Sequence, residues 1–415
     1  MIRRSLSTGI SSKLMLQYKI YIPFSICLLM MLIFDTYVLY TTDDNIISHN
    51  TLTKHAMVHV NTTEDHSTLY DNRKTHAIVH VGLRKTGTSS IQETKVKYKL
   101  QLEEDGYEMP KSIEHPVYEK NEFTFSDCFR EEQICTKRGQ ERVASGLEIA
   151  RRKKNILISS ENFSYANSYE KLSEYLSNWD HTTIIIYYRR YYDWMCSHYH
   201  ELLRFRKLKD TKLWEMTLLD YLKRQDARRI YIDRVMSRLR QVFDDIIIMD
   251  FHDKSQNLIE GFYCDAVPGA HHTCQAVVDA SAIGVSTRER VSLNLVWGDL
   301  AFAAKSAGLI DISSDIQMDF AKNAIQDHQE QILGLTKDDF KLNCLSNEIL
   351  QQILNESLKY ELTFFPERNE TDLRFDFEKA AKSKMCEVDL NAVLEDTEWR
   401  AFFKVLAGKL SSIED

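Results

Sequence analysis

Short apolar runs alternate with longer segments of helical periodicity between residues 76 and 251. The short runs are rich in β-branched residues, which is typical of strands buried on both faces of a parallel sheet. Alternation of such strands with helices predicts a three-layer α/β domain with a central parallel sheet. The predicted strands cover 76–81, 155–160, 182–188 and 245–251, and the predicted helices lie near 88–104, 140–153, 168–178, 190–208 and 214–243.

The pattern becomes helical from about residue 285 onward. Long segments with apolar residues at helical spacing follow, such as SNEILQQILNESLKYELTFF at 346–365. We therefore expect an α/β domain at 74–284 and a helical C-terminal part at 285–415 that packs on the sheet domain.

The N-terminal region contains an apolar block, IYIPFSICLLMMLIF at 20–34, which continues as TYVLY beyond Asp35 and follows a basic segment. About 20 apolar residues span a bilayer, and basic flanks remain cytosolic. This pattern predicts a cytosolic tail at 1–19, a signal-anchor transmembrane helix at 20–41 and a lumenal stem at 42–73. A cleaved signal peptide is the alternative, because the uninterrupted apolar block is short.

The net charge and the spacing of the Cys and His residues argue against nucleic-acid and metal partners. The net charge of −8 argues against a nucleic-acid partner, since nucleic-acid binding usually needs a basic surplus. The chain has no CxxC pair and no Cys/His spacing typical of zinc sites, so no metal is expected.

Cysteines and glycosylation sequons favour a lumenal compartment. Cys264 and Cys274 bracket a Pro-Gly turn that suits a disulfide. The remaining pairs that would complete a set are Cys128–Cys135 and Cys344–Cys386, which leave Cys196 free, although sequence alone leaves the pairing open. The sequons lie at Asn61, Asn162, Asn355 and Asn369.

The segment HAIVHVGLRKTGTSSIQ at 76–92 passes from an apolar strand through a loop into a helix. Gly82 and Gly87 permit a sharp turn and the close approach of an anion, and N–H groups at a helix N-terminus bind phosphate or sulfate. Lys85 adds a mobile positive charge. A Walker A nucleotide loop places its lysine directly after the second glycine, and this order is not found here. An ordinary strand-to-helix turn with a solvated lysine is the alternative.

A second motif lies in IIIYYRRYYDWMCSHYH at 184–200, where a strand ends at Arg189 and Ser197 follows in the next helix. Ligands of open α/β sheets bind outside the carboxyl ends of the strands, so Arg189 should face the same crevice as the first loop. The planar guanidinium suits a phosphate. For either residue alone, a purely structural role is the alternative.

Together the two motifs resemble those of the PAPS-dependent sulfotransferases, and the resemblance covers roughly residues 76–265. It implies a P-loop-like fold and PAPS (3′-phosphoadenosine-5′-phosphosulfate) as co-substrate, without a metal. Lys85 would neutralise the bridging oxygen as the sulfuryl group departs. Loop amides and the hydroxyls of Thr88 and Ser89 would hold the 5′-phosphosulfate. Arg189 and Ser197 would hold the 3′-phosphate. The implied cofactor-binding residues are Gly82, Arg84, Lys85, Thr86, Gly87, Thr88, Ser89, Arg189 and Ser197.

The acceptor hydroxyl needs a general base. Glu161 follows the strand at 155–160 and should open on the same crevice, which makes it the first candidate. Glu108 is the competing candidate, because several Golgi members of the family place a catalytic glutamate after the loop helix. For each glutamate, an ion pair with a nearby basic residue is the structural alternative.

The resemblance implies a Golgi enzyme, a single-pass type II membrane protein whose acceptor is a glycan hydroxyl. The Lys/Arg-rich stretch at 204–240 would suit an anionic glycan, although such stretches are more often solvated helix faces. The alternatives are a lumenal glycosyltransferase, a protein-tyrosine sulfotransferase and a non-catalytic nucleotide-binding relative.

Overall fold

The computed structural model describes residues 73–111, 123–130, 134–204, 216–223, 231–253, 257–282, 295–329 and 340–413. All of these belong to one compact unit, Ala56–Asp415. The predicted tail, the anchor and nearly all of the stem lie outside the described residues. Within the described ranges, none of the helices combines the length and the apolar character needed to span a bilayer.

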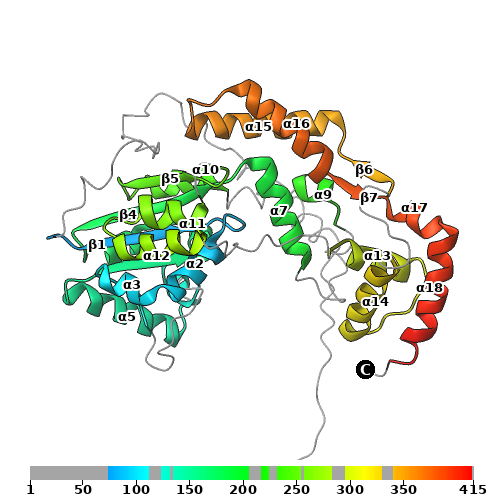
Figure 1. The fold of residues 1–415 in the computed structure, drawn as a ribbon, viewed down its shortest axis with the longest axis horizontal. Coiled ribbons are helices and arrows are strands. Elements are labelled where there is room, and N and C mark those ends of the chain that lie inside the picture. The colour runs from blue at the N-terminus through cyan, green and yellow to red at the C-terminus, as the bar shows by residue number, and fades with distance from the viewer. Residues whose placement is uncertain are drawn as a thin grey trace, which may run out of the picture. The chain divides into compact units, whose positions relative to one another are not determined.

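A five-stranded, fully parallel sheet forms the centre of the fold (Figure 1), which confirms the predicted α/β class. Its strands are β1 (His76–Val81), β2 (Tyr107–Glu108), β3 (Asn155–Ser160), β4 (His181–Tyr188) and β5 (Ile246–Asp250). The strand order is β2-β3-β1-β4-β5. Because β1 lies between β3 and β4, the carboxyl ends of these three strands meet at one edge of the sheet. β2 was not predicted, since two residues carry no periodicity.

Helices cover both faces of the sheet, because successive strand side chains point to opposite sides. Ile78 of β1 faces a core completed by helices that follow β1 and β5, whereas Val79 faces the opposite core. The first set comprises α2 (Thr88–Lys97), α3 (Lys99–Glu104), α11 (Leu258–Glu260), the π-helix η5 (Gly261–Ala266) and α12 (His271–Ala282). The second set comprises α4 (Phe123–Arg130), α5 (Lys137–Arg151), α6 (Glu170–Leu176), α7 (Tyr191–Arg204) and α10 (Ile232–Leu239). The α/β part of the molecule therefore has three layers, with the sheet between two layers of helices.

Two predicted helices are interrupted. The segment predicted at 88–104 contains α2 and α3, which meet at the non-helical Tyr98. The segment predicted at 214–243 contains α9 (Leu218–Lys223) and α10, and the extended backbone of Tyr231 directly before α10 marks the interruption; residues 224–230 lie outside the described ranges. Helical periodicity continues across both interruptions, so it could not reveal them.

The C-terminal part is mainly helical, as predicted, but it includes a short antiparallel sheet of β6 (Leu342–Cys344) and β7 (Cys386–Val388). Its helices are α13 (Leu295–Ser306), α14 (Asp315–Asp327), α15 (Asn347–Phe364), α16 (Glu370–Lys384), α17 (Leu390–Glu395) and α18 (Thr397–Leu410). α15 and α16 contribute Leu358 and Phe377 to the core on the α7 side of the sheet. The other four helices enclose a second core around Trp399 and Phe403.

Three disulfides confirm the pairing suggested by the sequence: Cys128–Cys135, Cys264–Cys274 and Cys344–Cys386. Cys344 and Cys386 lie directly opposite each other in the β6–β7 pair. Cys196 is free and buried, and burial raises the pKa of its thiol to about 12. A thiol of this kind is inert packing rather than a nucleophile.

His80 lies at the centre of the sheet and is completely buried. Its Nδ1 is 2.9 Å from Ser159 Oγ, and its ring packs edge-on against Phe262. Burial, assisted by the charge of Lys95, lowers the pKa of His80 to about 3. The folded protein therefore holds this imidazole neutral, whereas the unfolded chain protonates it near pH 6.5.

We predict an acid-dependent loss of stability through His80. As the pH falls from 6.5 toward 3, only the unfolded state takes up this proton, so the free energy of unfolding decreases. His80→Asn should reduce the slope of unfolding free energy against pH by up to about 1.4 kcal/mol per pH unit. Urea unfolding between pH 7 and pH 4.5 measures this slope, with the exposed His271→Asn as control. An unchanged slope in His80→Asn would contradict the assignment.

Candidate anion-binding site

The loop between β1 and α2 has an unusual backbone conformation. Lys85 has φ 67° and Gly87 has φ 80°, so both lie in the left-handed region. Alternation of right- and left-handed residues directs successive N–H groups toward one point and forms an anion-binding nest. For a residue with a side chain, the left-handed conformation costs roughly 1–2 kcal/mol. The folded protein therefore holds Lys85 in an unfavourable backbone conformation.

The amides at the start of α2 are available to a ligand. Gly87 caps the helix without a side-chain hydrogen bond, and its carbonyl accepts from the amides of Ser90 and Ile91. In the part of the chain that the structure describes, no acceptor pairs with the amides of the four preceding positions, which are Thr86, Gly87, Thr88 and Ser89. Because the positive end of the helix dipole adds to these donors, the loop is suited to an anion.

The two glycines are required for different reasons. A Cβ on Gly82 would lie 2.4 Å from Thr88 Oγ1, so Gly82 makes room for Thr88 rather than for the ligand expected from the sequence. A Cβ on Gly87 would lie 2.8 Å from Leu258 Cδ1, and its positive φ also disfavours a side chain.

The loop hydroxyls are partly used within the loop itself. Thr86 and Thr88 both donate to the carbonyl of Leu83, at 2.7 and 3.3 Å. Both threonines are buried, whereas Ser89 is half-buried. Of the two hydroxyls that the resemblance assigned to the 5′-phosphosulfate, that of Ser89 is therefore the more available.

Arg189 connects the second motif to the first. It follows β4, and its Nη1 donates to the carbonyl oxygen of Lys85 at 2.6 Å. Its guanidinium carbon lies 4.8 Å from the centre of the Phe251 ring. Its Nε is buried and has no partner among the described residues. Burial lowers the pKa of Arg189, and the charge of Asp193 opposes this shift. A buried guanidinium with a remaining donor is suited to an anionic ligand.

One face of α7 lies against the loop. Asp193, Ser197 and Glu201 are spaced four residues apart, so they lie on one stripe of the helix. Glu201 Oε2 is 3.5 Å from Lys85 Nζ. The half-buried Ser197 lies between two carboxylates on this stripe, on the side of the helix that meets the loop.

Arg84 belongs to the loop, and Glu161 follows the neighbouring strand β3. The indole N–H of Trp194 donates to the carbonyl of Arg84 at 3.0 Å, and the Arg84 guanidinium lies 5.5 Å from the centre of the Tyr165 ring. Tyr165 ends the 3-10 helix η3 (Glu161–Tyr165), which follows β3 directly. Burial raises the pKa of Tyr165, Arg84 opposes it, and the charges of Glu161 and Glu201 add to it. Both glutamates therefore lie close to this ring.

The structure does not bring Glu108 to the loop. Glu108 pairs with Ile156 at the start of β3, five residues before Glu161. Ile156 is four residues before Ser160, the last residue of β3, so at about 3.3 Å per residue Glu108 lies about 13 Å from the carboxyl end of that strand. Its carboxylate instead forms a bidentate ion pair with Arg152, at 2.8 and 2.7 Å. Glu108 therefore forms an ion pair with a nearby basic residue, which was the alternative to a catalytic role.

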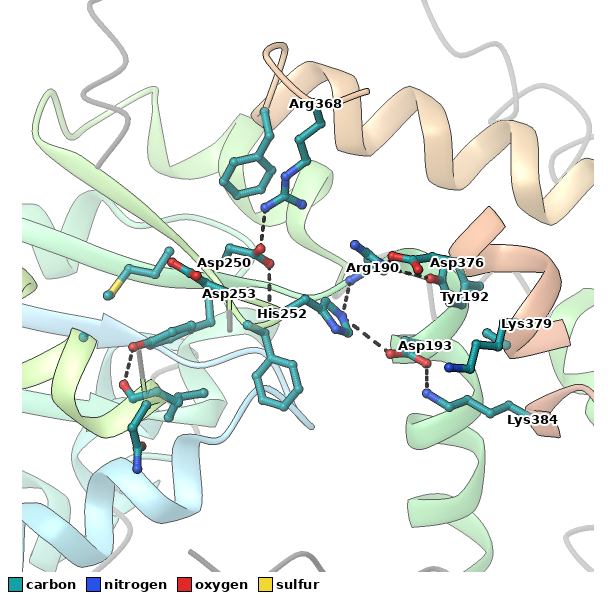
Figure 2. Close-up of a pocket in the computed structure, with 18 of the residues that line it drawn as sticks. Arg190, Tyr192, Asp193, Asp250, His252, Asp253, Arg368, Asp376, Lys379 and Lys384 are labelled. Atoms are coloured by element: carbon teal, nitrogen blue, oxygen red, sulfur yellow. Dashed lines mark hydrogen bonds and ion pairs between the residues drawn. The ribbon is translucent and has the colours of Figure 1, made fainter. Parts of the chain in front are cut away.

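A cavity of ≈ 710 Å³ lies beside the loop, at the carboxyl ends of β4 and β5. Leu258, which packs against Gly87, forms part of its lining. Figure 2 shows that Lys384 of α16 and His252 both point at Asp193. The cavity therefore adjoins the loop through Leu258.

Asp193 and Asp250, which line this cavity, both have cationic partners. Burial disfavours the carboxylate of Asp193, but the hydrogen bond from Lys384 and the charge of Arg189 hold its pKa below the usual value. Burial lowers the pKa of His252 to about 3 despite the nearby Asp193. Arg368 forms an ion pair with Asp250, as Figure 2 shows.

Sequence reasoning missed several of these residues. Glu201 follows Ser197 by one helical turn, so the spacing along α7 could have revealed it. Lys384 and Arg368 come from the C-terminal part of the chain, and no local pattern connects them with the loop. Tyr165 lies in a short 3-10 helix that has no periodic signal.

No protein-family model matches this chain, and no curated protein matches it in sequence. Within the described ranges, no group of three or more His, Cys, Asp or Glu side chains is arranged to hold a metal ion. The fold and the site together define an α/β protein with a candidate anion-binding loop directly after the central strand of a parallel sheet.

We predict that Gly87→Ala disrupts the anion-binding loop. Gly308→Ala is a matched control, because Gly308 has φ 70° but no atom within 4 Å of a new Cβ. Both variants should lose about 1–2 kcal/mol of unfolding free energy through the left-handed backbone. Gly87→Ala should lose more through the contact with Leu258, and its affinity for pyrophosphate should fall about tenfold or more. Calorimetric titration with pyrophosphate measures this, and equal affinity in both variants would refute the role of the loop.

Proposed function

We propose that the protein is a PAPS-dependent sulfotransferase that moves a sulfuryl group from PAPS to a hydroxyl of a glycan. The observation that supports this proposal is the hydrogen bond from Arg189 to the carbonyl of Lys85, which brings two motifs that are distant in the sequence into contact. A ligand with an anionic group at each end would then contact both motifs.

The donor nucleotide would be held at its two charged ends. The amides that open α2, with Lys85 and Ser89, would bind the 5′-phosphosulfate. The buried Nε of Arg189 has no partner among the described residues. Arg189 and Ser197 would together bind the 3′-phosphate. The resemblance assigns the same roles to these residues, so the local geometry and the motif favour the same ligand.

The cavity beside the loop would receive the nucleoside. Its ≈ 710 Å³ lies within the usual range for ligand sites. Phe251 lines it and also contacts the Arg189 guanidinium, so a base stacked there would lie next to the 3′-phosphate site.

Sulfuryl transfer, like phosphoryl transfer, depends mainly on positioning and electrostatic stabilisation. The acceptor oxygen would attack sulfur in line with the bridging oxygen, whose developing charge Lys85 would neutralise. Glu161 is the proposed base, since it directly follows the carboxyl end of β3, whereas Glu108 lies beside the start of that strand. No metal is part of the proposal.

Localisation is proposed on the same basis. Three disulfides are typical of an oxidising compartment, and the apolar block at 20–34 would anchor a type II protein in the Golgi membrane. The acceptor would then be a glycan of the secretory pathway.

The function is tested with the purified full-length protein, labelled PAPS and a panel of glycans. Lys85→Ala should keep its affinity for adenosine 3′,5′-bisphosphate within a few-fold but lose transfer by about 100-fold or more. Transfer by both proteins at equal rates would remove Lys85 from the mechanism. Binding without transfer to any acceptor would favour a non-catalytic nucleotide-binding protein, and absence of binding would refute the proposal.

Localisation is tested by glycan mapping after expression in eukaryotic cells. Asn355 and Asn369 are exposed and should carry glycans. Asn162 should not, because it is half-buried and its amide donates to Asp127 at 2.8 Å. Peptide mass spectrometry before and after enzymatic glycan release reads this out. Unmodified Asn355 and Asn369 would contradict a lumenal location.

A further inference from the structure

The loop lysine already has an anionic partner. Lys85 Nζ lies 3.5 Å from Glu201 Oε2, and the two side chains are only 33% and 20% exposed. This contact is therefore partly shielded from water, which strengthens an ion pair relative to one on the open surface. Glu201 belongs to α7, so the pair connects the first motif to the helix of the second.

The hydrogen-bond donors of the loop fall into two groups, one without an acceptor and one that already faces a carboxylate. The amides that open α2 have no acceptor among the described residues, whereas the Lys85 ammonium faces a carboxylate. An anion that binds these amides brings negative charge to Lys85 as well. Such an anion and Glu201 therefore compete for one ammonium group.

The backbone around this pair is held on both sides. Arg189 donates to the carbonyl of Lys85, and Trp194 donates to the carbonyl of Arg84. α7 and the loop are thereby fixed to each other, so the exchange of partners requires only rotation of the flexible Lys85 side chain.

We propose that Glu201 is a positioning residue that occupies Lys85 in place of the ligand and so lowers the affinity of the loop for the 5′-phosphate end of the nucleotide. The inference rests on the proposed function and adds a determinant of donor affinity to it. Among the carboxylates near the crevice, Glu201 is singled out by its direct contact with the ammonium group. Asp193, one helical turn before Ser197, is instead bound by Lys384.

Competition has a measurable consequence. Ion pairs of this kind stabilise by an amount equivalent to about a two- to fivefold change in an equilibrium constant. Glu201→Gln preserves the size of the side chain but releases Lys85. Its affinity for adenosine 3′,5′-bisphosphate should therefore increase about two- to fivefold, whereas damage to a structural contact would weaken binding.

The experiment measures nucleotide affinity by calorimetry on four full-length proteins, which are the wild type, Glu201→Gln, Lys85→Ala and the double variant. In the Lys85→Ala background, Glu201→Gln should have no effect, because the group that transmits it is absent. Adenosine 3′-monophosphate is the control ligand, because it lacks the 5′-phosphate that would contact Lys85. Glu201→Gln should therefore leave the affinity for this ligand unchanged. Glu174→Gln on the exposed surface of α6 controls for the change of net charge.

The outcomes separate this inference from the function on which it rests. A wild-type protein that binds neither nucleotide refutes the proposed function. A wild-type protein that binds, with unchanged or weaker binding in Glu201→Gln, overturns the competition alone. A further result against the proposal is an equal increase in the affinity for adenosine 3′,5′-bisphosphate when Glu201→Gln is made in the Lys85→Ala background. Another is an increase in the affinity for adenosine 3′-monophosphate by the same factor. Either result would show that Glu201 acts only through its long-range charge, and would likewise overturn the proposal. Thermal unfolding of each variant verifies that it is folded.

Discussion

The hydrogen bond between the Arg189 guanidinium and the Lys85 carbonyl joins two motifs separated by 104 positions. It can form because β1 lies between β3 and β4 in a fully parallel sheet, which brings their carboxyl ends to one edge. Without this strand order, the loop amides and the arginine would be separate surface features. The crevice and its chemistry follow from this one constraint.

The polar groups of the crevice divide into two kinds. The amides at the start of α2 and the Nε of Arg189 have no partner among the described residues. Lys85 and Lys384, in contrast, both face carboxylates. An anionic ligand would bind the first kind directly, but it would have to displace an internal carboxylate from the second. The affinity of such a site depends on the internal pairs as much as on the free donors.

The C-terminal helices take part in the site although the motifs lie elsewhere. α16 places Lys384 against Asp193, and Arg368, between α15 and α16, pairs with Asp250 at the end of β5. The cavity is consequently lined by both parts of the chain. A fragment that ended near residue 284 would lack Lys384 and Arg368, so Asp193 and Asp250 would lose these ion-pair partners.

The sequence by itself determined the features that depend on near neighbours. Apolar runs located the four longer strands, and glycine spacing located the loop. The turn in CDAVPGAHHTC indicated the Cys264–Cys274 pair. Each of these follows from burial or backbone conformation within about ten residues, and a linear pattern records such preferences.

Only the tertiary structure decided which distant groups meet. Glu108 and Glu161 were both candidates, and the register of β2 against the start of β3 separates Glu108 from the crevice. Glu201 reaches Lys85 because α7 packs beside the loop, and Lys384 reaches Asp193 because α16 packs against α7. Strand order and helix packing arise from contacts between remote segments, and no local pattern encodes them.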